Sequence, residues 1–286
     1  MVHKIIITAD DLGIDTPINK GIIETFHKGL LSSSALLMNV PHTEEGIRLA
    51  KENPGLEVGL HLSIVEGISL RGVESSVTDS LRYFNNKICL IRHWKTLLKK
   101  YLTGSLKLSE LQEELELQII EFLKHFDNIP FLNGTQHIHI LPGVWRVVFE
   151  LCKKYNIRAV RLPRIQSPSP LWLNKRFPFL VPFQVFGQMA RADLKKVGIK
   201  YPDDVLGMQY SGKISEERLL FILKHLPKGN VEIVMHPGYE SIYLRENLPW
   251  GYKTFDWEIE KDALQSTKIK SYMEQNNIEL INFSKL

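Results

Sequence analysis

The chain has 286 residues, of which 44% are hydrophobic and 24% charged, and these ordinary globular values exclude an intrinsically disordered protein. Its 36 Lys and Arg against 32 Asp and Glu leave a formal charge of +4, without the basic stripe that nucleic-acid binders concentrate on one face. No run reaches the ~20 apolar residues of a membrane helix, and the two cysteines form no disulfide pattern, so we expect a cytoplasmic protein without nucleic-acid or membrane partners.

Short apolar runs alternate along the chain with longer segments of helical periodicity. Residues 4–8 are typical of a buried strand, and a helix is predicted at 18–29, because Ile18, Ile22 and Phe26 recur on one face and Gly29 can end it. Further strands are predicted at 34–40, 56–64, 131–140, 157–162, 231–235 and 278–283. Further helices are predicted at 43–52, 92–102, 109–126, 144–155, 215–226 and 262–276.

This alternation of strand and helix predicts an α/β fold with a mostly parallel sheet. A single domain over residues 1–286 fits a closed or nearly closed barrel, since such barrels commonly have about 250 residues. An open, doubly wound sheet is the alternative, although no GxGxxG motif follows a predicted strand. Two segments interrupt the alternation, at about 66–108 and 163–213, and we expect them to be long insertions at the barrel rim.

Polar side chains follow several predicted strands, at the carboxyl ends where α/β barrels carry their active sites. Asp10 and Asp11 come directly after the first strand. Two adjacent carboxylates repel each other unless a cation lies between them, so one could bind a metal ion while the other stays free as a base. For this pair alone, capping of the following helix or turn is an equally good interpretation.

Histidines occupy three other strand ends. His61 lies in the third strand and points to the face opposite its leucine neighbours. His137 and His139, on an extended chain, would point to one side and present two nitrogens to a metal ion or substrate. His236 ends an apolar strand, where the following Pro-Gly turn would hold it at the rim for proton transfer. Taken singly, each motif also fits a hydrogen-bonded core or turn histidine.

One arginine completes the set. Arg161 lies at the end of the strand predicted at 157–162, where it could pair with a carboxylate or a substrate oxygen. The sequence has neither a GxSxG nucleophile elbow nor a P-loop, which argues against a serine hydrolase and a nucleotide-binding protein. Aspartates, histidines and an arginine at successive strand ends together favour a metal-dependent hydrolase.

The segments around these residues resemble those of the YdjC-like carbohydrate deacetylases, the group that contains chitooligosaccharide deacetylase and the hopanoid-associated deacetylases. They read ITADDLG at 7–13, GLHL at 59–62, QHIH at 136–139, RLPR at 161–164 and HPG at 236–238, so the resemblance covers nearly the whole chain. It implies a distorted TIM-like barrel, distantly similar to NodB-type polysaccharide deacetylases. It also implies one divalent metal ion and hydrolysis of an N-acetyl group on a small acetylated carbohydrate.

Carried over residue by residue, the resemblance implies roles for five side chains. Asp11 and His61 match ligands of the metal ion, which would be zinc or magnesium. Asp10 matches the general base and His236 the general acid. Arg161 would orient the base or the substrate.

One position departs from the family's pattern. The family commonly reads Asp-x-His-x-His-x-His where this chain reads NGT at 133–135, so Thr135 stands at the usual third metal ligand. His137 is the expected replacement, and water could also fill the position. His139 and Tyr239 are expected to contact the substrate.

The two insertions would form the walls of a sugar-binding groove. Candidates for stacking on sugar faces are Trp94, Trp172, Tyr239 and Trp250. Two other functions stay open, a catalytically weakened sugar-binding protein on the same scaffold and a deacylase of another small amide. A C2 homodimer is the default expectation for the oligomeric state.

Overall fold

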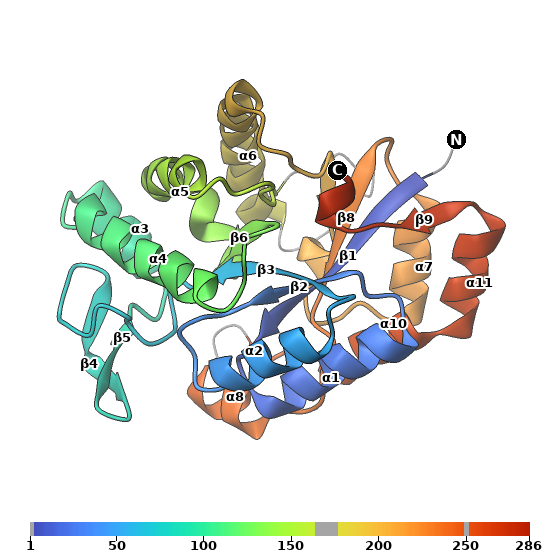
Figure 1. Ribbon diagram of the computed structural model, residues 1–286, viewed down its shortest axis with the longest axis horizontal. Helices are drawn as coiled ribbons and strands as arrows, with labels where there is room; N and C mark the ends of the chain where they lie inside the picture. The colour runs from blue at the N-terminus through green and yellow to red at the C-terminus, as the bar shows by residue number, and fades with distance from the viewer. Residues whose placement is uncertain (1–2, 164–176, 249–251) are drawn as a thin grey trace.

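A parallel sheet forms the centre of the molecule (Figure 1). The computed structural model describes residues 3–163, 177–248 and 252–286. Neighbouring strands follow the order β6-β3-β2-β1-β8-β7, and β9 pairs with the first residues of β1. The strands are β1 (His3–Leu12), β2 (Ser33–Leu36), β3 (Glu57–Leu62), β6 (Leu132–Gly134), β7 (Asp204–Leu206), β8 (Asn230–Met235) and β9 (Ile278–Leu280).

Backbone hydrogen bonds close the gap between the two edges of this sheet. Leu132 of β6 pairs with Val160, and Ala159 pairs with Lys200, from which the chain runs on into β7 at the other edge. The Lys200 N–H donates to the Arg158 carbonyl (3.0 Å), and the Val160 N–H donates to the Lys200 carbonyl (2.9 Å). The wall therefore continues around the core, which confirms a distorted TIM-like barrel and rules out the open sheet.

Helices connect the strands and cover the outside of the barrel. In Figure 1, α1, α2 and α10 lie along one flank, and α4 and α5 lie together on another. The helices of the barrel are α1 (Thr16–Lys28), α2 (Thr43–Glu52), α4 (Leu108–Leu123), α5 (Pro142–Lys154), α6 (Phe177–Val197), α7 (Glu216–Lys224), α8 (Ile242–Asn247), α10 (Trp257–Gln265) and α11 (Thr267–Gln275).

The two predicted insertions fare differently. The first holds a hairpin of β4 (Thr78–Phe84) and β5 (Lys87–Leu90) and helix α3 (Trp94–Leu102), all lying to one side of the barrel in Figure 1. The second was predicted too long, because Lys200 and β7 belong to the barrel wall. A strand of three residues is too short for its alternation to be recognised. Residues 164–176 of this insertion lie outside the described part of the chain.

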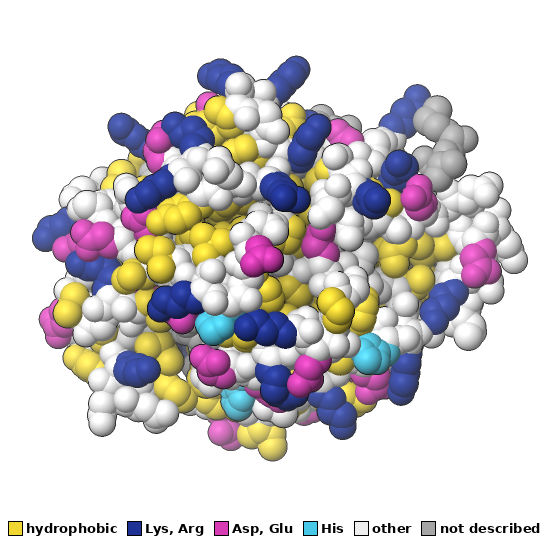
Figure 2. Space-filling model, in the orientation of Figure 1, with side chains coloured by type: hydrophobic (Ala, Val, Ile, Leu, Met, Phe, Trp, Pro, Cys, Tyr) yellow, Lys and Arg dark blue, Asp and Glu magenta, His cyan; other side chains and the backbone are white. Residues whose placement is uncertain are grey.

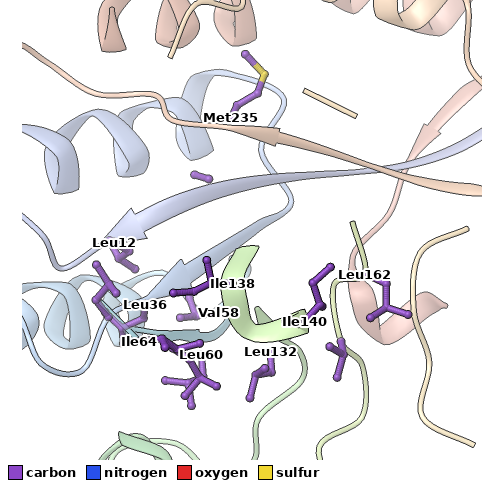
Figure 3. Packing of buried hydrophobic residues seen from close by; sticks show 14 of the residues in the cluster. Leu12, Leu36, Val58, Leu60, Ile64, Leu132, Ile138, Ile140, Leu162 and Met235 are labelled. Atoms are coloured by element: carbon purple, nitrogen blue, oxygen red, sulfur yellow. The ribbon is translucent and has the colours of Figure 1, made fainter. Parts of the chain in front are cut away.

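The predicted strand at 131–140 is wrong beyond residue 134. A 3-10 turn, η1 (Thr135–Ile140), follows β6, and inside it Gln136 and His137 have φ angles of 52° and 57°. Figure 3 shows Ile138 projecting from this turn into the packed apolar side chains of the core. Because the backbone turns, His137 and His139 do not share one face of an extended strand. The expectation that strand geometry points both imidazoles to one side is therefore wrong.

Two other elements differ in detail. The helix predicted at 262–276 is two helices, because the Ser266 hydroxyl caps α11 by accepting from the Ile269 N–H (3.3 Å) where α10 ends. The segment predicted as a strand at 157–162 makes isolated bridges rather than a regular strand.

The surface carries both signs of charge. On the face shown in Figure 2, basic and acidic side chains are interspersed, as the small net charge would suggest. No helix within the described ranges combines the length and apolar character needed to cross a bilayer.

Candidate active site

A β-bulge at the end of β1 carries two aspartates into one buried network. The pairing of β1 with β2 shifts register between Ala9 and Leu12, and Asp11 adopts a φ of 71°. A bulge re-aims side chains that would otherwise alternate, and Asp tolerates the left-handed region better than most residues. Asp10 and Asp11 are 3% and 5% exposed. Two neighbouring carboxylates therefore enter the same buried site.

Arg161 forms a bidentate ion pair with Asp10 through two hydrogen bonds. Its Nη1 donates to Asp10 Oδ2 (2.6 Å) and its Nη2 to Asp10 Oδ1 (2.9 Å). Burial would raise the pKa of Asp10, but Arg161, His61 and His236 together outweigh it and hold that pKa well below the usual range. Such bidentate pairs fix geometry as well as charge. The predicted link between Arg161 and the base therefore exists as a direct ion pair.

Glu232 is a second partner of Arg161 and was missed in the sequence. It lies on β8 with no exposed surface, and its Oε1 accepts from Arg161 Nε (2.9 Å) and Nη2 (2.6 Å) and from the Thr8 hydroxyl (2.7 Å). Its Oε2 has no partner among the described residues, and burial raises the pKa of Glu232. The available signal was a charged residue inside an apolar strand, which is rarely buried unless paired.

His61, Asn133 and the two aspartates form one continuous chain of contacts. His61 Nδ1 lies 2.6 Å from Asn133 Oδ1, and Asn133 Nδ2 donates to Asp10 Oδ1 (3.0 Å). On the other side of the imidazole, His61 Nε2 lies 3.4 Å from Asp11 Oδ1. Burial lowers the pKa of His61, but the charges of Asp10 and Asp11 more than offset this and leave it raised. β3 and β6 thus bring a histidine and an amide to the aspartates of β1.

Two further residues near Asp11 were not predicted from the sequence. The Tyr252 hydroxyl donates to Asp11 Oδ2 (2.9 Å), and burial, then the charge of Asp11, raise the Tyr252 pKa far above its ordinary value. Glu66 is 8% exposed, accepts from Gln136 Nε2 (3.1 Å) and leaves its Oε1 without a partner in the described structure. Burial raises the pKa of Glu66 to about 7, and the nearby charge of Asp11 adds to the shift. Glu66 lies in a loop and Tyr252 in the short connection between α8 and α10, where no periodic pattern marks them.

His236 occupies the end of β8, as predicted. The residues that follow pack closely against α1, where a Cβ on Gly21 would lie 2.3 Å from the Gly238 Cα, so position 21 requires a glycine. The backbone N–H of His236 donates to Glu260 Oε2 (2.5 Å), and its Nδ1 lies 3.7 Å from the same oxygen. Burial lowers the pKa of His236, but Glu260 and the two aspartates more than offset this and leave it raised. The surrounding carboxylates therefore favour the protonated form of His236.

The other two predicted histidines are held in different ways. His139 is fully buried, and its Nε2 donates to the Arg161 carbonyl (2.9 Å), so it helps to fix the backbone of Arg161. With no exposed surface it is not placed to touch a substrate, contrary to our expectation. His137 has a buried Nδ1 without a hydrogen-bond partner in the described structure. Burial, then the charge of Arg161, lower the pKa of His137 far below its ordinary value, which keeps the ring neutral.

The predicted aromatic contacts find little support. Tyr239 lies between α1 and α10, where its hydroxyl bonds Glu24 and its ring sits under the ammonium groups of Lys20 (5.1 Å) and Lys261 (5.0 Å). That setting is outside the chain of contacts around Asp10, and a contact of Tyr239 with the substrate stays a prediction. Trp94 is partly buried against the core. Trp172 and Trp250 lie outside the described residues.

The donors around Asp11 fit a divalent ion held by two protein ligands. Two ligands about 2.1 Å from one tetrahedral ion are about 3.4 Å apart, which matches the separation of Asp11 Oδ1 and His61 Nε2 (3.4 Å). No set of three or more His, Cys, Asp or Glu is arranged to hold a metal ion within residues 3–163, 177–248 and 252–286. Thr135 Oγ1 accepts from the Ile64 N–H (3.4 Å). Water or substrate would therefore complete the coordination.

Comparisons with known proteins agree with the resemblance read from the motifs. The YdjC-like protein family matches residues 4–275. A carbohydrate deacetylase of Mus musculus is 28% identical over 97% of this chain and 93% of its own length, and one of Clostridium beijerinckii is 26% identical over 98% of both. A solved protein of Enterococcus faecalis V583, provisionally named a cellobiose-phosphate cleavage protein, matches 100% of this chain and 99% of its own with a TM-score of 0.75 at 22% identity, which supports the fold. The chain belongs to the YdjC-like protein family.

Proposed function

We propose that this protein is a metal-dependent carbohydrate deacetylase that removes an N-acetyl group from an acetylated sugar. The observation that carries the proposal is the juxtaposition of an Asp11–His61 pair at metal-ligand spacing with an Asp10 carboxylate gripped by Arg161. Membership of the YdjC-like family supports it, as do the carbohydrate deacetylases among the relatives. Hydrolysis of an N-acetyl group needs an activated water, a base and an acid, and the site offers a candidate for each.

Asp10 is the general base in this proposal, and its hydrogen-bond partners prepare it for that role. Because Arg161 and the nearby histidines hold the pKa of Asp10 well below its usual range, this carboxylate is ionised at neutral pH and ready to accept a proton from water. An ion held by Asp11 and His61 would polarise the acetyl carbonyl and acidify the attacking water, as a base of such low pKa requires. Arg161 and Asn133 fix both oxygens of Asp10, so the carboxylate keeps one orientation during the reaction.

His236 accounts for the acid. In the overall reaction the water oxygen bonds to the acetyl carbon, the carbon–nitrogen bond breaks, and acetate leaves while the amine nitrogen gains a proton. The raised pKa of His236 favours its protonated imidazole, which is the state that can supply this proton. Glu260, which bonds the backbone of His236, holds the imidazole at the end of β8.

Metal content and acetate release test the proposal together. We expect about one equivalent of zinc or another divalent ion in the purified protein, lost in His61→Ala and retained in a surface control, His125→Ala. We also expect acetate release from N,N′-diacetylchitobiose or another N-acetylated sugar, abolished in Asp11→Ala although circular dichroism shows a native fold. Near-normal turnover by Asp11→Ala would refute the assignment.

One observation favours a second candidate, a sugar-binding protein that has lost catalysis. The donor set lacks a third His, Cys, Asp or Glu in the described chain, and Thr135 stands where the family carries a histidine. This candidate predicts saturable binding of an N-acetylated sugar without acetate release at any concentration of zinc or magnesium. A third, the hydrolysis of a different small amide, would show as acetate or acyl release from non-sugar substrates only.

A further inference from the structure

Asn133 occupies the centre of the buried network, with a polar group on each side. It lies on β6 with no exposed surface. Its Oδ1 is 2.6 Å from His61 Nδ1, and its Nδ2 is 3.0 Å from Asp10 Oδ1. The same amide thus touches the proposed base and one proposed metal ligand.

The direction of both hydrogen bonds follows from the charge of Asp10. A carboxylate that accepts hydrogen bonds from an arginine through both of its oxygens is ionised and can only accept, and Asp10 does so from Arg161 Nη1 (2.6 Å) and Nη2 (2.9 Å). The amide nitrogen of Asn133 must therefore face Asp10, since the reverse orientation would set two acceptor oxygens 3.0 Å apart. The amide oxygen then faces His61, so the Nδ1 of His61 must carry a proton and donate it to this bond.

This arrangement decides which nitrogen of His61 is free. A neutral imidazole with its proton on Nδ1 has its lone pair on Nε2, and Nε2 is the atom that lies 3.4 Å from Asp11 Oδ1. A metal-ligating histidine usually has its other ring nitrogen fixed by such a partner. Here the partner of the histidine also donates a hydrogen bond to a carboxylate.

We infer that Asn133 is a positioning residue that couples the two halves of the site: it sets the tautomer of His61 and the orientation of Asp10 at once. The Asn133 amide meets both demands, because it offers one acceptor and two donors, whereas a carboxylate could not donate to Asp10 and an apolar side chain could do neither. The inference rests on the proposed function for its purpose, but the tautomer itself is a property of the metal-free protein.

Long-range ¹H–¹⁵N correlation spectra of the metal-free protein, followed through a pH series until the ring ¹⁵N shifts show His61 to be neutral, test the tautomer directly. We expect the native His61 to carry its proton on Nδ1. In Asn133→Leu the proton should move to Nε2, from which it can donate to Asp11. Asn39→Leu, which removes a buried amide from a different loop (3% exposed), should leave the His61 signals unchanged.

Asn133→Asp separates the two tasks and serves if Asn133→Leu does not fold. The carboxylate keeps an acceptor for His61 but loses the donor to Asp10, so the Nδ1–H tautomer should persist while kcat falls more than KM changes. Zinc titration against a chromophoric chelator should give a Kd about 10- to 100-fold weaker in Asn133→Leu, the usual effect of removing a partner of a metal ligand.

Two results would overturn the inference, an unchanged His61 tautomer in Asn133→Leu or a changed one in Asn133→Asp. Failure of the native protein to release acetate is a separate outcome, because it would refute the proposed function and leave the spectroscopic result standing.

Discussion

Replacing Glu66 by Gln should stabilise the protein at neutral and alkaline pH. The Glu66 carboxyl is 8% exposed, one of its oxygens has no partner in the described structure, and the other accepts a hydrogen bond from Gln136 Nε2 (3.1 Å). Ionising this group inside the protein is unfavourable, since burial and the charge of Asp11 both act against a second negative charge. The Glu66→Gln substitution removes the charge, while the new amide oxygen can still accept from Gln136.

The magnitude follows from the two pKa values. The pKa of Glu66 is about 7 in the folded protein against the ordinary value of 4.5. Below pH 4.5 the carboxyl is protonated in both the folded and the unfolded state, so it does not change the free energy of unfolding. Between pH 4.5 and 7 the unfolded chain ionises first, so the native protein loses stability as the pH rises, and above pH 7 the loss is constant. At ~1.4 kcal/mol per pH unit, the full loss is about 3 kcal/mol.

Urea denaturation at about pH 4.5 and about pH 8 measures this effect. The free energies of unfolding of the native protein and Glu66→Gln should be similar at the lower pH, and the variant should be more stable by up to about 3 kcal/mol at the higher pH. All other titrating groups are shared and cancel in the difference. Glu44→Gln, on the exposed face of α2, is the matched control and should show no such divergence. Parallel curves for the native protein and Glu66→Gln would refute the reasoning.

Three further outcomes follow from the packing and the hydrogen bonds of the site. Gly21→Ala should lower the free energy of unfolding by about 1–3 kcal/mol in thermal or urea melts, because the new methyl would lie 2.3 Å from the Gly238 Cα, and an unchanged melt would contradict this close approach. Tyr252→Phe removes the donor to Asp11 Oδ2 and should weaken zinc binding about 10-fold or more in a chelator competition, whereas an unaltered Kd would show that this bond is dispensable. Cys152, whose pKa burial raises to about 12, should stay unmodified by iodoacetamide at about pH 8 in the folded protein and react only in urea, as peptide mass mapping would reveal.

Local patterns in the sequence were enough to predict the fold class and several site residues. The apolar run of β1 ends in two aspartates and that of β8 in a histidine, and in a parallel barrel such ends meet at one rim. The motif resemblance indicated the YdjC-like family, which the match over residues 4–275 confirms. A carboxylate was one of the two partners expected for Arg161, the other being a substrate oxygen, and the structure pairs it with Asp10.

Only the tertiary structure decided which polar side chains support the site and which lie elsewhere. Glu232 bonds Arg161 across 71 positions of the chain and Tyr252 bonds Asp11 across 241, and neither residue was singled out in the sequence. Tyr239 follows His236 closely in sequence, yet the chain turns at Gly238 and carries its ring outward between α1 and α10.

The turn after β6 shows most clearly why the local sequence does not determine where these side chains point. The same short run of alternating residues can form a strand or a 3-10 turn. Which of the two forms depends on the position of the apolar side chains against which Ile138 packs. Those partners come from other strands of the barrel, so the local sequence cannot specify them. The positive φ angles of Gln136 and His137 follow from that packing. Periodicity thus predicts the elements and their ends, whereas contacts between distant segments decide the direction in which each side chain points.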